Sequence, residues 1–470
     1  MKTLLITLLV LSSSLFTFCN AQFSNLINFN AELPPLGSLP QGSLTLSPSG
    51  TVLYGMAQNG GANNWGCIFS IHTDGSSYTD LYDFTPAGGE PQGTLTISAS
   101  GTVLYGMAYG GAHGEGFLFS IHTDGTHYTD ILDLNGTNGN GPVGSLVHSG
   151  GLLYETTGLG GANNDGCILV LDTNGNHSRV LFSFDGTNGK VACGLLLSGH
   201  TLFGMANGGG AHTYGDIFSI DTNGSNFKDL LDFNDTNGQW PLGNLILLHN
   251  KLYGMTQNVR GYFGNIFSID TNGNHFTSLY SFTGTNGAAP AGGLTLVGNK
   301  FYGMTKLGGA NSLGVIFSID TNGNAYNVML NFEGTNGSYP WGNLTLSGNS
   351  LYGMTYNGGV NSEGNIFKID TDNFATSINQ LSAISGNIHV YPNPSNGVFN
   401  VVCHAERSEE SLPIINMYNM LGEQVLTETL RSAQGDNAID LSSQPNGIYF
   451  YRVIANSGEL MGEGKLIIQK

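Results

Sequence analysis

The chain has 470 residues and a net charge of −19, which results from 33 acidic residues and 14 Lys and Arg residues. This excess of negative charge argues against a surface that binds nucleic acid or another polyanion, because phosphate recognition depends on Lys and Arg. With 71 Gly, 40% hydrophobic residues and only 10% charged residues, the composition favours short strands and tight turns that build several sheets around one core.

Residues 1–21 have the pattern of a secretory signal peptide. A charged start precedes the apolar run LLITLLVLSSSLFTF, and the exit sequence CNA follows at 19–21. We expect cleavage after Ala21. The alternative is a lipoprotein anchored through Cys19, but Phe18 stands where lipoprotein signals carry a small residue. No later stretch approaches the roughly 18 apolar residues of a membrane span, and we therefore predict no transmembrane segment in the mature chain.

One motif recurs seven times between residues 22 and 370, at intervals of 49–51 residues. Its clearest copy reads GNLTLSGNSLYGMTYNGGVNSEGNIFKIDT, and each copy splits into four short apolar runs separated by Gly and Asn. A period near fifty is typical of propeller blades, and four such runs predict four antiparallel strands. The aromatic residues of the LYGM-like tetrapeptide, which we expect to be buried between sheets, are Tyr54, Tyr105, Tyr154, Phe203, Tyr253, Tyr302 and Tyr352. The predicted fold class is all-β, with a seven-bladed β-propeller.

The fourth run of each copy ends in a large apolar residue. These residues are Phe29, Phe84, Leu134, Phe184, Phe233, Phe282 and Phe332. The first run of this type along the chain, FSNLINF at 23–29, comes before all of the LYGM-like tetrapeptides. No matching run follows the last copy after Lys368. We therefore predict that residues 23–29 supply the outer strand of the seventh blade, which closes the propeller and leaves no open sheet edge.

The recurring DTNG tetrapeptide, for example Asp172–Gly175, carries oxygen atoms that would suit calcium. A calcium loop of the EF-hand kind needs Gly at its sixth position and Glu at its twelfth, whereas Gly is the fourth residue of the tetrapeptide. Asn-Gly between two alternating runs instead predicts a hairpin turn in which both residues have positive φ. His72 and His122 replace the Asp in two copies, with no second ligand at a useful spacing. We predict neither a metal site nor a cofactor site.

The mature chain contains Cys67, Cys167, Cys193 and Cys403. We interpret them as small buried hydrophobic residues. Cys67 and Cys167 occupy matching positions of the first and third copies, and matching strands of blades that are not neighbours lie beyond the reach of a disulfide.

The connections between strands fall into two sets. In a four-stranded meander, the turns after the first and third strands lie on one face, and the connections after the second and fourth strands lie on the other. The first set is nearly constant, whereas the second set, which we call the variable face, differs from copy to copy. Variable loops on a rigid scaffold usually carry binding residues, and flat aromatic side chains suit sugar rings. The candidate binding residues are Trp65, Trp240, Trp341, Tyr214, Tyr262, Tyr339 and His113. The alternative for Trp240 and Trp341, which adjoin prolines, is that they cap the start of inner strands.

An enzyme that cleaves polysaccharides would need two carboxylates about 5 to 10 Å apart. Carboxylates of the variable face are Glu90, Glu115, Asp165, Asp216 and Glu363, each on a different blade, and no sequence feature pairs them. We predict no catalytic residue. The favoured function is a monomeric, non-enzymatic module that binds a glycan or a surface protein. The alternatives are an extracellular polysaccharide-degrading enzyme and a passive structural protein of the cell surface.

The repeat resembles two known families. Its combination of LYGMTxxGG, GxIFSIDTNG and FxGTNG resembles the GloVer tandem repeat of exported bacterial proteins, over about 350 residues. The double glycines, such as Gly60-Gly61, also resemble those of kelch repeats, which implies a kelch-like propeller. The resemblance implies a fold and export but no activity. Copy three departs from it with LYETT and copy five with VRGYFG, and either departure could mark a local site.

The repeat stops near residue 370, where a polar linker (371–386) leads to a second domain at 387–470, predicted as a small β-sandwich. Its opening motif YPNP, central turn LG, penultimate strand NGIY and ending KLII resemble the type A C-terminal sorting domain of the type IX secretion system of Bacteroidota. The resemblance implies handling by the type IX machinery, followed by release or attachment at the cell surface. It assigns the sorting motif to Tyr391, Pro392, Asn393, Pro394, Gly422, Asn446, Gly447, Tyr449 and Lys465. HAERSEES at 404–411 and LRSAQGD at 430–436 read as paired insertions between strands.

Overall fold

The structure is a computed structural model that describes residues 23–30, 36–258, 263–371, 388–404, 413–419, 424–430, 434–454 and 460–470. Within these ranges every regular element is a β-strand. Contacts divide the chain into an N-terminal unit, Met1–Asp372, and a C-terminal unit, Asn373–Lys470. The described residues include no helix long and apolar enough to span a membrane. The predicted signal peptide at 1–21 and nearly all of the predicted linker at 371–386 lie outside the described residues.

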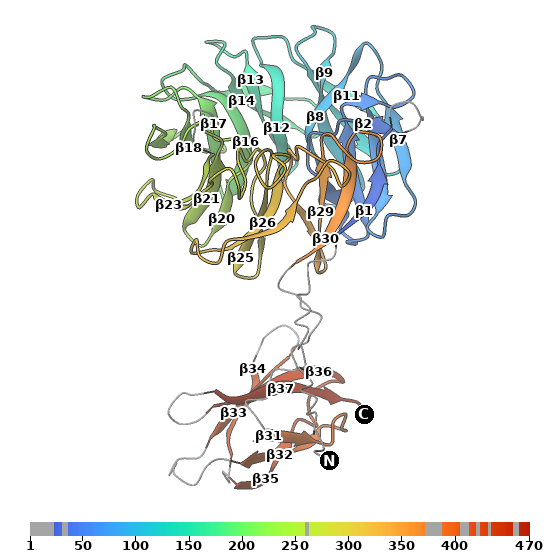
Figure 1. Cartoon of the computed structure of the whole chain (residues 1–470), viewed down its shortest axis with the longest axis vertical. Coiled ribbons are helices and arrows are strands. Elements are labelled where there is room, and N and C mark those ends of the chain that lie inside the picture. The colour runs from blue at the N-terminus through green and yellow to red at the C-terminus, as the bar shows by residue number, and fades with distance from the viewer. Residues whose placement is uncertain are drawn as a thin grey trace, which may run out of the picture. The chain divides into compact units, whose positions relative to one another are not determined.

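The described strands of the N-terminal unit form five four-stranded antiparallel sheets, one eight-stranded sheet and one two-stranded sheet. The eight-stranded sheet consists of two four-stranded antiparallel halves, so we number seven four-stranded groups by their order along the chain and call them sheets 1 to 7. Figure 1 shows the sheets arranged around a common centre. Sheets 2 and 3 are joined by a single parallel bridge between Thr94 and Ser145. The first strands of sheets 1 to 7 are β3 (Thr45–Leu46), β8 (Gly88–Ile97), β12 (Asn140–Ser149), β16 (Lys190–Ser198), β20 (Ile246–Leu248), β24 (Thr295–Val297) and β28 (Thr345–Ser347).

The second and third strands of each sheet form a regular hairpin around the LYGM-like and IFSID-like sequences. The second strands are β4 (Val52–Ala57), β9 (Val103–Gly110), β13 (Leu152–Leu159), β17 (Thr201–Gly208), β21 (Lys251–Thr256), β25 (Lys300–Thr305) and β29 (Ser350–Thr355). The third strands are β6 (Cys67–His72), β10 (Phe117–His122), β14 (Cys167–Asp172), β18 (Asp216–Asp221), β22 (Asn265–Asp270), β26 (Val315–Asp320) and β30 (Asn365–Asp370). A short pair, β2 (Gly37–Ser38) with β5 (Asn59–Gly60), lies beside sheet 1.

The fourth strand of sheet 7 comes from the N-terminal end of the chain. The fourth strands are β7 (Thr79–Asp83), β11 (Thr129–Asp133), β15 (Arg179–Ser183), β19 (Lys228–Asp232), β23 (Thr277–Ser281), β27 (Asn327–Asn331) and, in sheet 7, β1 (Phe23–Asn28). β1 runs antiparallel to β30, with Ser24 opposite Lys368 and Asn28 opposite Asn365. Phe29, directly after β1, is fully buried, and its ring lies 5.5 Å from that of Phe69 in sheet 1. The sequence therefore placed this strand beside the correct partner.

The core of the N-terminal unit lies between neighbouring sheets. The LYGM aromatic residues are 0–7% exposed, as predicted. Tyr54 of sheet 1 and Phe84, which follows sheet 1, lie in one cluster with Phe119 of sheet 2. The Gly of the tetrapeptide makes room for an aromatic ring, because a Cβ on Gly303 would lie 2.6 Å from the ring of Phe317. This close approach explains why the tetrapeptide contains Gly inside a strand.

The LYETT departure of copy three buries a carboxyl group. Glu155 replaces the Gly of the tetrapeptide, and Leu169 replaces the facing Phe, which leaves space for the longer side chain. Glu155 is fully buried, and neither of its carboxylate oxygens has a hydrogen-bond partner among the described residues. Burial raises the pKa of Glu155 well above its ordinary value. The departure therefore lies inside the core rather than at the surface.

The DTNG turns differ from the predicted two-residue hairpin. The Asp172 N–H donates to the Asn176 carbonyl at 3.0 Å, and the Gly175 N–H donates to the Asp172 carbonyl at 2.9 Å. Gly175 has φ 80°, and the second residue with positive φ is His177 (54°) rather than Asn174. The loop is therefore one residue longer than a turn of Asn and Gly alone. In this copy the Asp172 carboxylate accepts the N–H groups of Asn174 and Asn176. In the three later copies the Asn side chain of the tetrapeptide accepts the N–H two residues on.

Three Cys side chains can be described. Cys67, Cys167 and Cys193 are buried and free, in agreement with their interpretation as small core residues. Burial raises the pKa of Cys193 to about 12 and that of Cys167 to about 11, so neither thiol is activated as a nucleophile.

The C-terminal unit contains two sheets that share one core. The three-stranded sheet has the order β31 (Ile388–Tyr391), β32 (Val398–His404) and β35 (Gln434–Asp440). The four-stranded sheet has the order β34 (Gln424–Thr429), β33 (Ile414–Tyr418), β36 (Gly447–Ile454) and β37 (Leu460–Ile468). Phe399 and Val401 of the first sheet pack in one cluster with Ile415, Tyr449 and Leu466 of the second.

Candidate functional site

One hydrogen bond, repeated seven times, holds the two kinds of connection of the variable face together. In each case a residue ahead of the first strand, or among the first three residues of that strand, has φ between 49° and 64°. Its N–H donates to a carbonyl in the loop after the second strand of the preceding sheet. The donor and acceptor residues are Leu39 and Glu363, Glu90 and Trp65, Gly141 and Glu115, Val191 and Asp165, Trp240 and Tyr214, Ala289 and Phe263, and Tyr339 and Leu313, with N···O distances of 2.8–3.1 Å. Both sets of variable connections therefore meet on one face.

The three Trp residues occupy three different positions of this arrangement. Trp65 is an acceptor residue and is 37% exposed. Trp240 is a donor residue, and its half-buried ring contacts the edge of the Tyr214 ring at 5.8 Å. Trp341 follows Pro340, and its ring centroid lies 3.7 Å from Lys306 Nζ and 6.5 Å from the Tyr356 ring. Within the described part of the chain, Trp65 makes no ring contact with the other two.

The other predicted binding residues are distributed over the same face. Tyr339 is the donor residue before sheet 7 and is half-buried, and its carbonyl accepts the Tyr356 N–H at 3.3 Å. His113 is exposed in the loop after β9. Tyr262 lies outside the described residues. The structure therefore brings Tyr214 to Trp240 but does not gather the predicted residues into one cluster.

A pocket of about 700 Å³ opens between sheets 5 and 6 on the variable face. Its apolar lining includes Phe263, Ala288, Ala289 and Leu307, and Lys306 also lines it. Phe263 is 40% exposed and Leu307 is 39% exposed. Sequence reasoning missed these residues, although Phe263 occupies the same acceptor position as Trp65 and Tyr214.

Exposed large apolar side chains of the N-terminal unit are concentrated on the variable face. They lie at the end of the second strand or in the loop after it: Trp65, Leu159, Phe263, Leu307 and Val360. Among the described residues of this unit, Leu152 at the start of β13 is the other such side chain. Phe263 and Leu307 line one pocket, whereas Trp65, Leu159 and Val360 belong to three other sheets.

The first strands approach one another through a series of glycines. A Cβ on Gly144 would lie 2.7 Å from the Gly194 backbone N, and a Cβ on Gly42, Gly93 or Gly342 would overlap the backbone of the next sheet. A small polar pocket of about 160 Å³ lies here, lined by Gln41, Gln92, Asn244, Asn343 and Trp341 together with glycines. No side chain other than hydrogen fits at these contacts.

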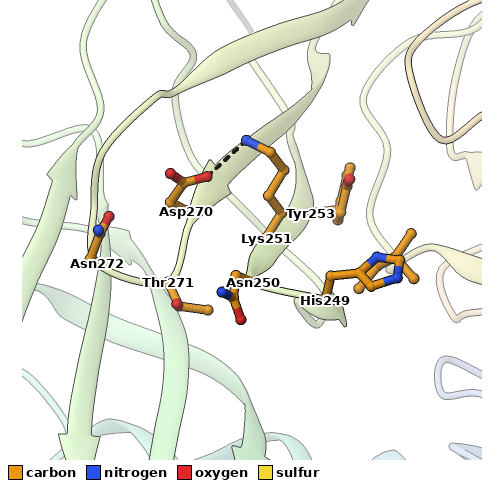
Figure 2. Close-up of a pocket in the computed structure, with 8 residues that line it drawn as sticks. His249, Asn250, Lys251, Tyr253, Asp270, Thr271 and Asn272 are labelled. Atoms are coloured by element: carbon orange, nitrogen blue, oxygen red, sulfur yellow. Dashed lines mark hydrogen bonds and ion pairs between the residues drawn. The ribbon is translucent and has the colours of Figure 1, made fainter.

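A third pocket, of about 360 Å³, lies among the constant turns of sheet 5. Figure 2 shows the Lys251 side chain directed at Asp270, while His249 points away from this pair. Lys251 Nζ lies 2.8 Å from Asp270 Oδ1, and His275 Nδ1 lies 2.7 Å from Asp270 Oδ2. The Lys251 hydrogen bond, followed by that of His275, lowers the pKa of Asp270. The charges of this pocket are therefore paired with one another.

Asp216 is wrongly placed by the sequence prediction, which assigned it to a variable loop. It is the first residue of β18 and is fully buried, because the loop already ends at Gly215. Glu90 is the third residue of β8, so it too lies in a strand, whereas Glu115, Asp165 and Glu363 lie in loops after second strands. Asp165 forms an ion pair with Lys190 at 3.5 Å. Glu115, Asp165 and Glu363 occupy the acceptor position of three different sheets.

Replacing Asp216 by Asn should stabilise the protein. Both carboxylate oxygens of Asp216 are buried without a hydrogen-bond partner, whereas Asn265 and Asn365 at the same repeat position donate to backbone carbonyls. Burial, then Asp229 and Asp232, raise the pKa of Asp216 to about 8. The folded state therefore binds this proton more tightly than the unfolded chain, and stability falls as pH rises from about 4 to about 8.

We expect Asp216→Asn to raise the free energy of unfolding at pH 8 by about 2 kcal/mol and to flatten its decrease between pH 4 and 8. Urea unfolding at several pH values measures both effects. Glu333→Gln, at an exposed site, is the matched control. Equal pH profiles for the wild type and Asp216→Asn would contradict the prediction.

The residues of the predicted sorting motif surround the last strand of the C-terminal unit. Asn393 Nδ2 donates to the Lys465 carbonyl at 2.8 Å, and Asn393 Oδ1 accepts the Ile467 N–H at 2.9 Å. Asn446 Oδ1 accepts the Lys470 N–H at 3.0 Å. The Tyr449 hydroxyl donates to the Pro445 carbonyl at 2.9 Å. Tyr391, Pro392 and Pro394 are exposed, Gly447 begins β36, and Gly422 lies outside the described residues.

Comparison with protein families gives two matches. The Gloeobacter/Verrucomicrobia repeat matches residues 12–200, 191–299 and 258–403. The secretion system C-terminal sorting domain matches residues 389–469. A search of curated proteins gave no match.

The solved structures that resemble the chain include three with 9–13% sequence identity. The extracellular domain of a B. thetaiotaomicron protein is 13% identical, with a TM-score of 0.47 over 92% of this chain and 59% of that one. YCF48 from Cyanidioschyzon merolae is 9% identical, with a TM-score of 0.48 over 74% of this chain and 98% of that one. A Trypanosoma rangeli sialidase in complex with the inhibitor DANA is 10% identical, with a TM-score of 0.42 over 96% of this chain and 91% of that one. The chain spans less than two thirds of the length of the first two structures found. Likenesses of this strength say nothing about activity.

Proposed function

Because the chain belongs to the Gloeobacter/Verrucomicrobia repeat family and ends in a secretion system C-terminal sorting domain, we propose that its N-terminal unit is a non-enzymatic binding module that works outside the cell. The sorting domain directs the protein through the type IX secretion machinery, so the protein is secreted or attached to the cell surface. A signal peptide at 1–21, a linker at 371–386 and a sorting domain at 387–470 complete the proposed organisation.

We further propose that residues 22–370 form a closed, kelch-like propeller with seven blades. The pairing of β1 with β30 supports closure. The Leu39 N–H donates to the Glu363 carbonyl between sheets 1 and 7, which is the bond that also links each other pair of neighbours. The Thr345 hydroxyl donates to the Leu44 carbonyl at 2.6 Å, and the equivalent Thr295 hydroxyl donates to Leu344 of the next sheet at the same distance.

The observation that carries the binding function is the concentration of exposed apolar side chains on the variable face. Their spread over five of the seven sheets suits an extended ligand, such as a glycan chain or the surface of another protein. The enzyme alternative requires two carboxylates about 5 to 10 Å apart that act on one bond. Glu115, Asp165 and Glu363 come from three different sheets, and Asp165 is paired with Lys190. A passive structural protein would show no saturable ligand.

An array of polysaccharides and glycans tests this proposal. We expect saturable binding by the purified protein and a loss of about tenfold or more when Phe263 and Leu307 are both replaced by Ser, because two exposed apolar contacts disappear. The Trp65, Trp240 and Trp341 triple Ala variant should also bind weakly. Leu152→Ala, an exposed apolar residue away from this face, is the control.

Three outcomes would contradict the proposal. Equal loss in the Leu152→Ala control would place the site elsewhere. Release of new reducing ends from a bound glycan would show an enzyme rather than a binding module. The absence of saturable binding, on the array and to extracellular proteins, would leave the structural role.

A further inference from the structure

The pocket between sheets 5 and 6 is lined by both apolar and polar groups. Phe263, Ala288, Ala289 and Leu307 supply apolar surface. Amide and hydroxyl groups of Gln257, Thr283, Thr285 and Ser312 also line it. Its volume of about 700 Å³ lies in the ordinary range for small-ligand sites. A sugar ring has this combination of an apolar face and hydroxyl groups at its edge.

Lys306 gives this pocket a positive charge that no acidic side chain balances. Among the described residues Lys306 has no carboxylate within ion-pair distance, whereas Lys190 and Lys251 pair with Asp165 and Asp270. Its ammonium lies 3.7 Å from the centroid of the Trp341 ring. A cation–π contact fixes the position of the ammonium but leaves its N–H donors available to an anion.

The positive charge of Lys306 contrasts with the acidic composition of the protein. The whole protein carries a net charge of −19, yet this half-buried cation lies at an apolar pocket and is held by an aromatic ring rather than by an acid. Burial lowers the pKa of Lys306, as expected for a cation without a counter-ion. A ligand carboxylate would supply the missing partner and form a charge-assisted hydrogen bond.

We propose that this pocket binds a hexuronic acid unit, with the sugar carboxylate on Lys306 and the apolar face of the ring against Phe263 and Leu307. The proposal rests on the proposed binding function of the variable face and names its ligand class. The net negative charge of the protein repels long polyanionic chains, so the ligand is a short acidic oligosaccharide or the end of a chain. The Trp341 ring holds the ammonium in place and does not itself stack on the sugar.

Titration calorimetry with the full chain tests the proposal, using trigalacturonic acid and its neutral counterpart, a galactose trisaccharide. We expect the acid to bind about 10- to 100-fold more tightly than the neutral sugar, as a charge-assisted hydrogen bond would give. Lys306→Gln should remove this preference, and Lys306→Arg should keep it. Binding of the acid to the wild type should weaken as salt rises.

Lys190→Gln is the matched control, because it removes one positive charge from the same face but lies outside the pocket. It should leave the preference for the acid intact. Thermal melting of each variant shows whether the loss of the contact with Trp341 has disturbed the fold. If Lys306→Gln does not fold, the comparison of the acid with the neutral sugar on the wild-type protein decides.

The outcomes separate this proposal from the broader one. Equal affinity for acid and neutral sugar in the wild type would overturn the uronic acid assignment while the binding function stands. A preference for the acid that Lys306→Gln retains would overturn the role of Lys306. If the protein binds phenylpropionate but neither trisaccharide, the uronic acid assignment is wrong and the ligand is an aryl carboxylate. If the array also gives no saturable ligand, the binding function itself fails.

Discussion

We expect removal of residues 23–29 to abolish the cooperative unfolding transition of the N-terminal unit. Without β1, the β30 edge of sheet 7 would lose its hydrogen bonds and become an open edge. Phe29 would leave the core between sheets 7 and 1, where its N–H donates to the Gly364 carbonyl at 3.0 Å and its carbonyl accepts Asn361 Nδ2 at 2.9 Å. Loss of a buried Phe side chain alone costs about 3 to 5 kcal/mol, a large part of the stability of a typical domain.

Thermal and urea unfolding followed by tryptophan fluorescence measure this effect. Phe29→Ala provides a milder variant, for which we expect a loss of about 3 kcal/mol. Phe263→Ala, at a partly exposed Phe, is its matched control and should cost much less. A deletion variant with the midpoint of the wild type would refute the proposed closure.

Adding one methyl group at the centre of the unit is the second change for which we expect a large effect. A Cβ on Gly342 would overlap the backbone of Gly42, and a Cβ on Gly292 would overlap that of Gly342. Backbone atoms cannot rotate away as a side chain can, so neighbouring sheets would have to separate. We expect Gly342→Ala and Gly292→Ala each to cost about 3 kcal/mol, the upper part of the range for overpacked cores.

Gly208→Ala is the control for these variants, because a Cβ on Gly208 meets no atom within 4 Å and this residue needs no positive φ. Urea unfolding of the three variants gives the comparison. A normal midpoint for Gly342→Ala, together with a loss for Gly292→Ala, would mean that sheets 6 and 7 touch but sheets 7 and 1 do not.

Much of the fold could be predicted because its main signals are local and repeated. The alternation of the LYGM-like and IFSID-like runs places Tyr and Phe between sheets, where the structure buries them. FSNLINF stands before the first copy and the last copy lacks such a run, which was enough to pair residues 23–29 with the last sheet. The DTNG sequences do form turns, but each turn is one residue longer than Asn-Gly alone, because an Asp or Asn side chain of the tetrapeptide accepts the N–H of the residue after Gly.

From the sequence, the candidate site could be assigned to the variable face but not to a particular pocket on it. Trp240 and Trp341 lie on opposite sides of a Pro in equivalent connections, and this offset gives them different neighbours, Tyr214 in one case and Lys306 in the other. Lys306 and Trp341 come from adjacent repeats, so their contact follows from packing between sheets rather than from local pattern. An alignment of the seven copies would have shown Lys306 as a lone cation at its repeat position.

The functional proposal depends on the proposed closure of the propeller, since a closed ring places every variable loop on one face. Its most direct test is oxidation of a Ser24→Cys, Lys368→Cys variant in a Cys403→Ser background, because residues opposite each other in antiparallel strands lie within reach of a disulfide. Mass spectrometry should find the two peptides linked within one chain, and no link when Ser268, the equivalent residue of sheet 5, carries the second Cys instead. Free thiols at 24 and 368, or links only between chains, would contradict the account.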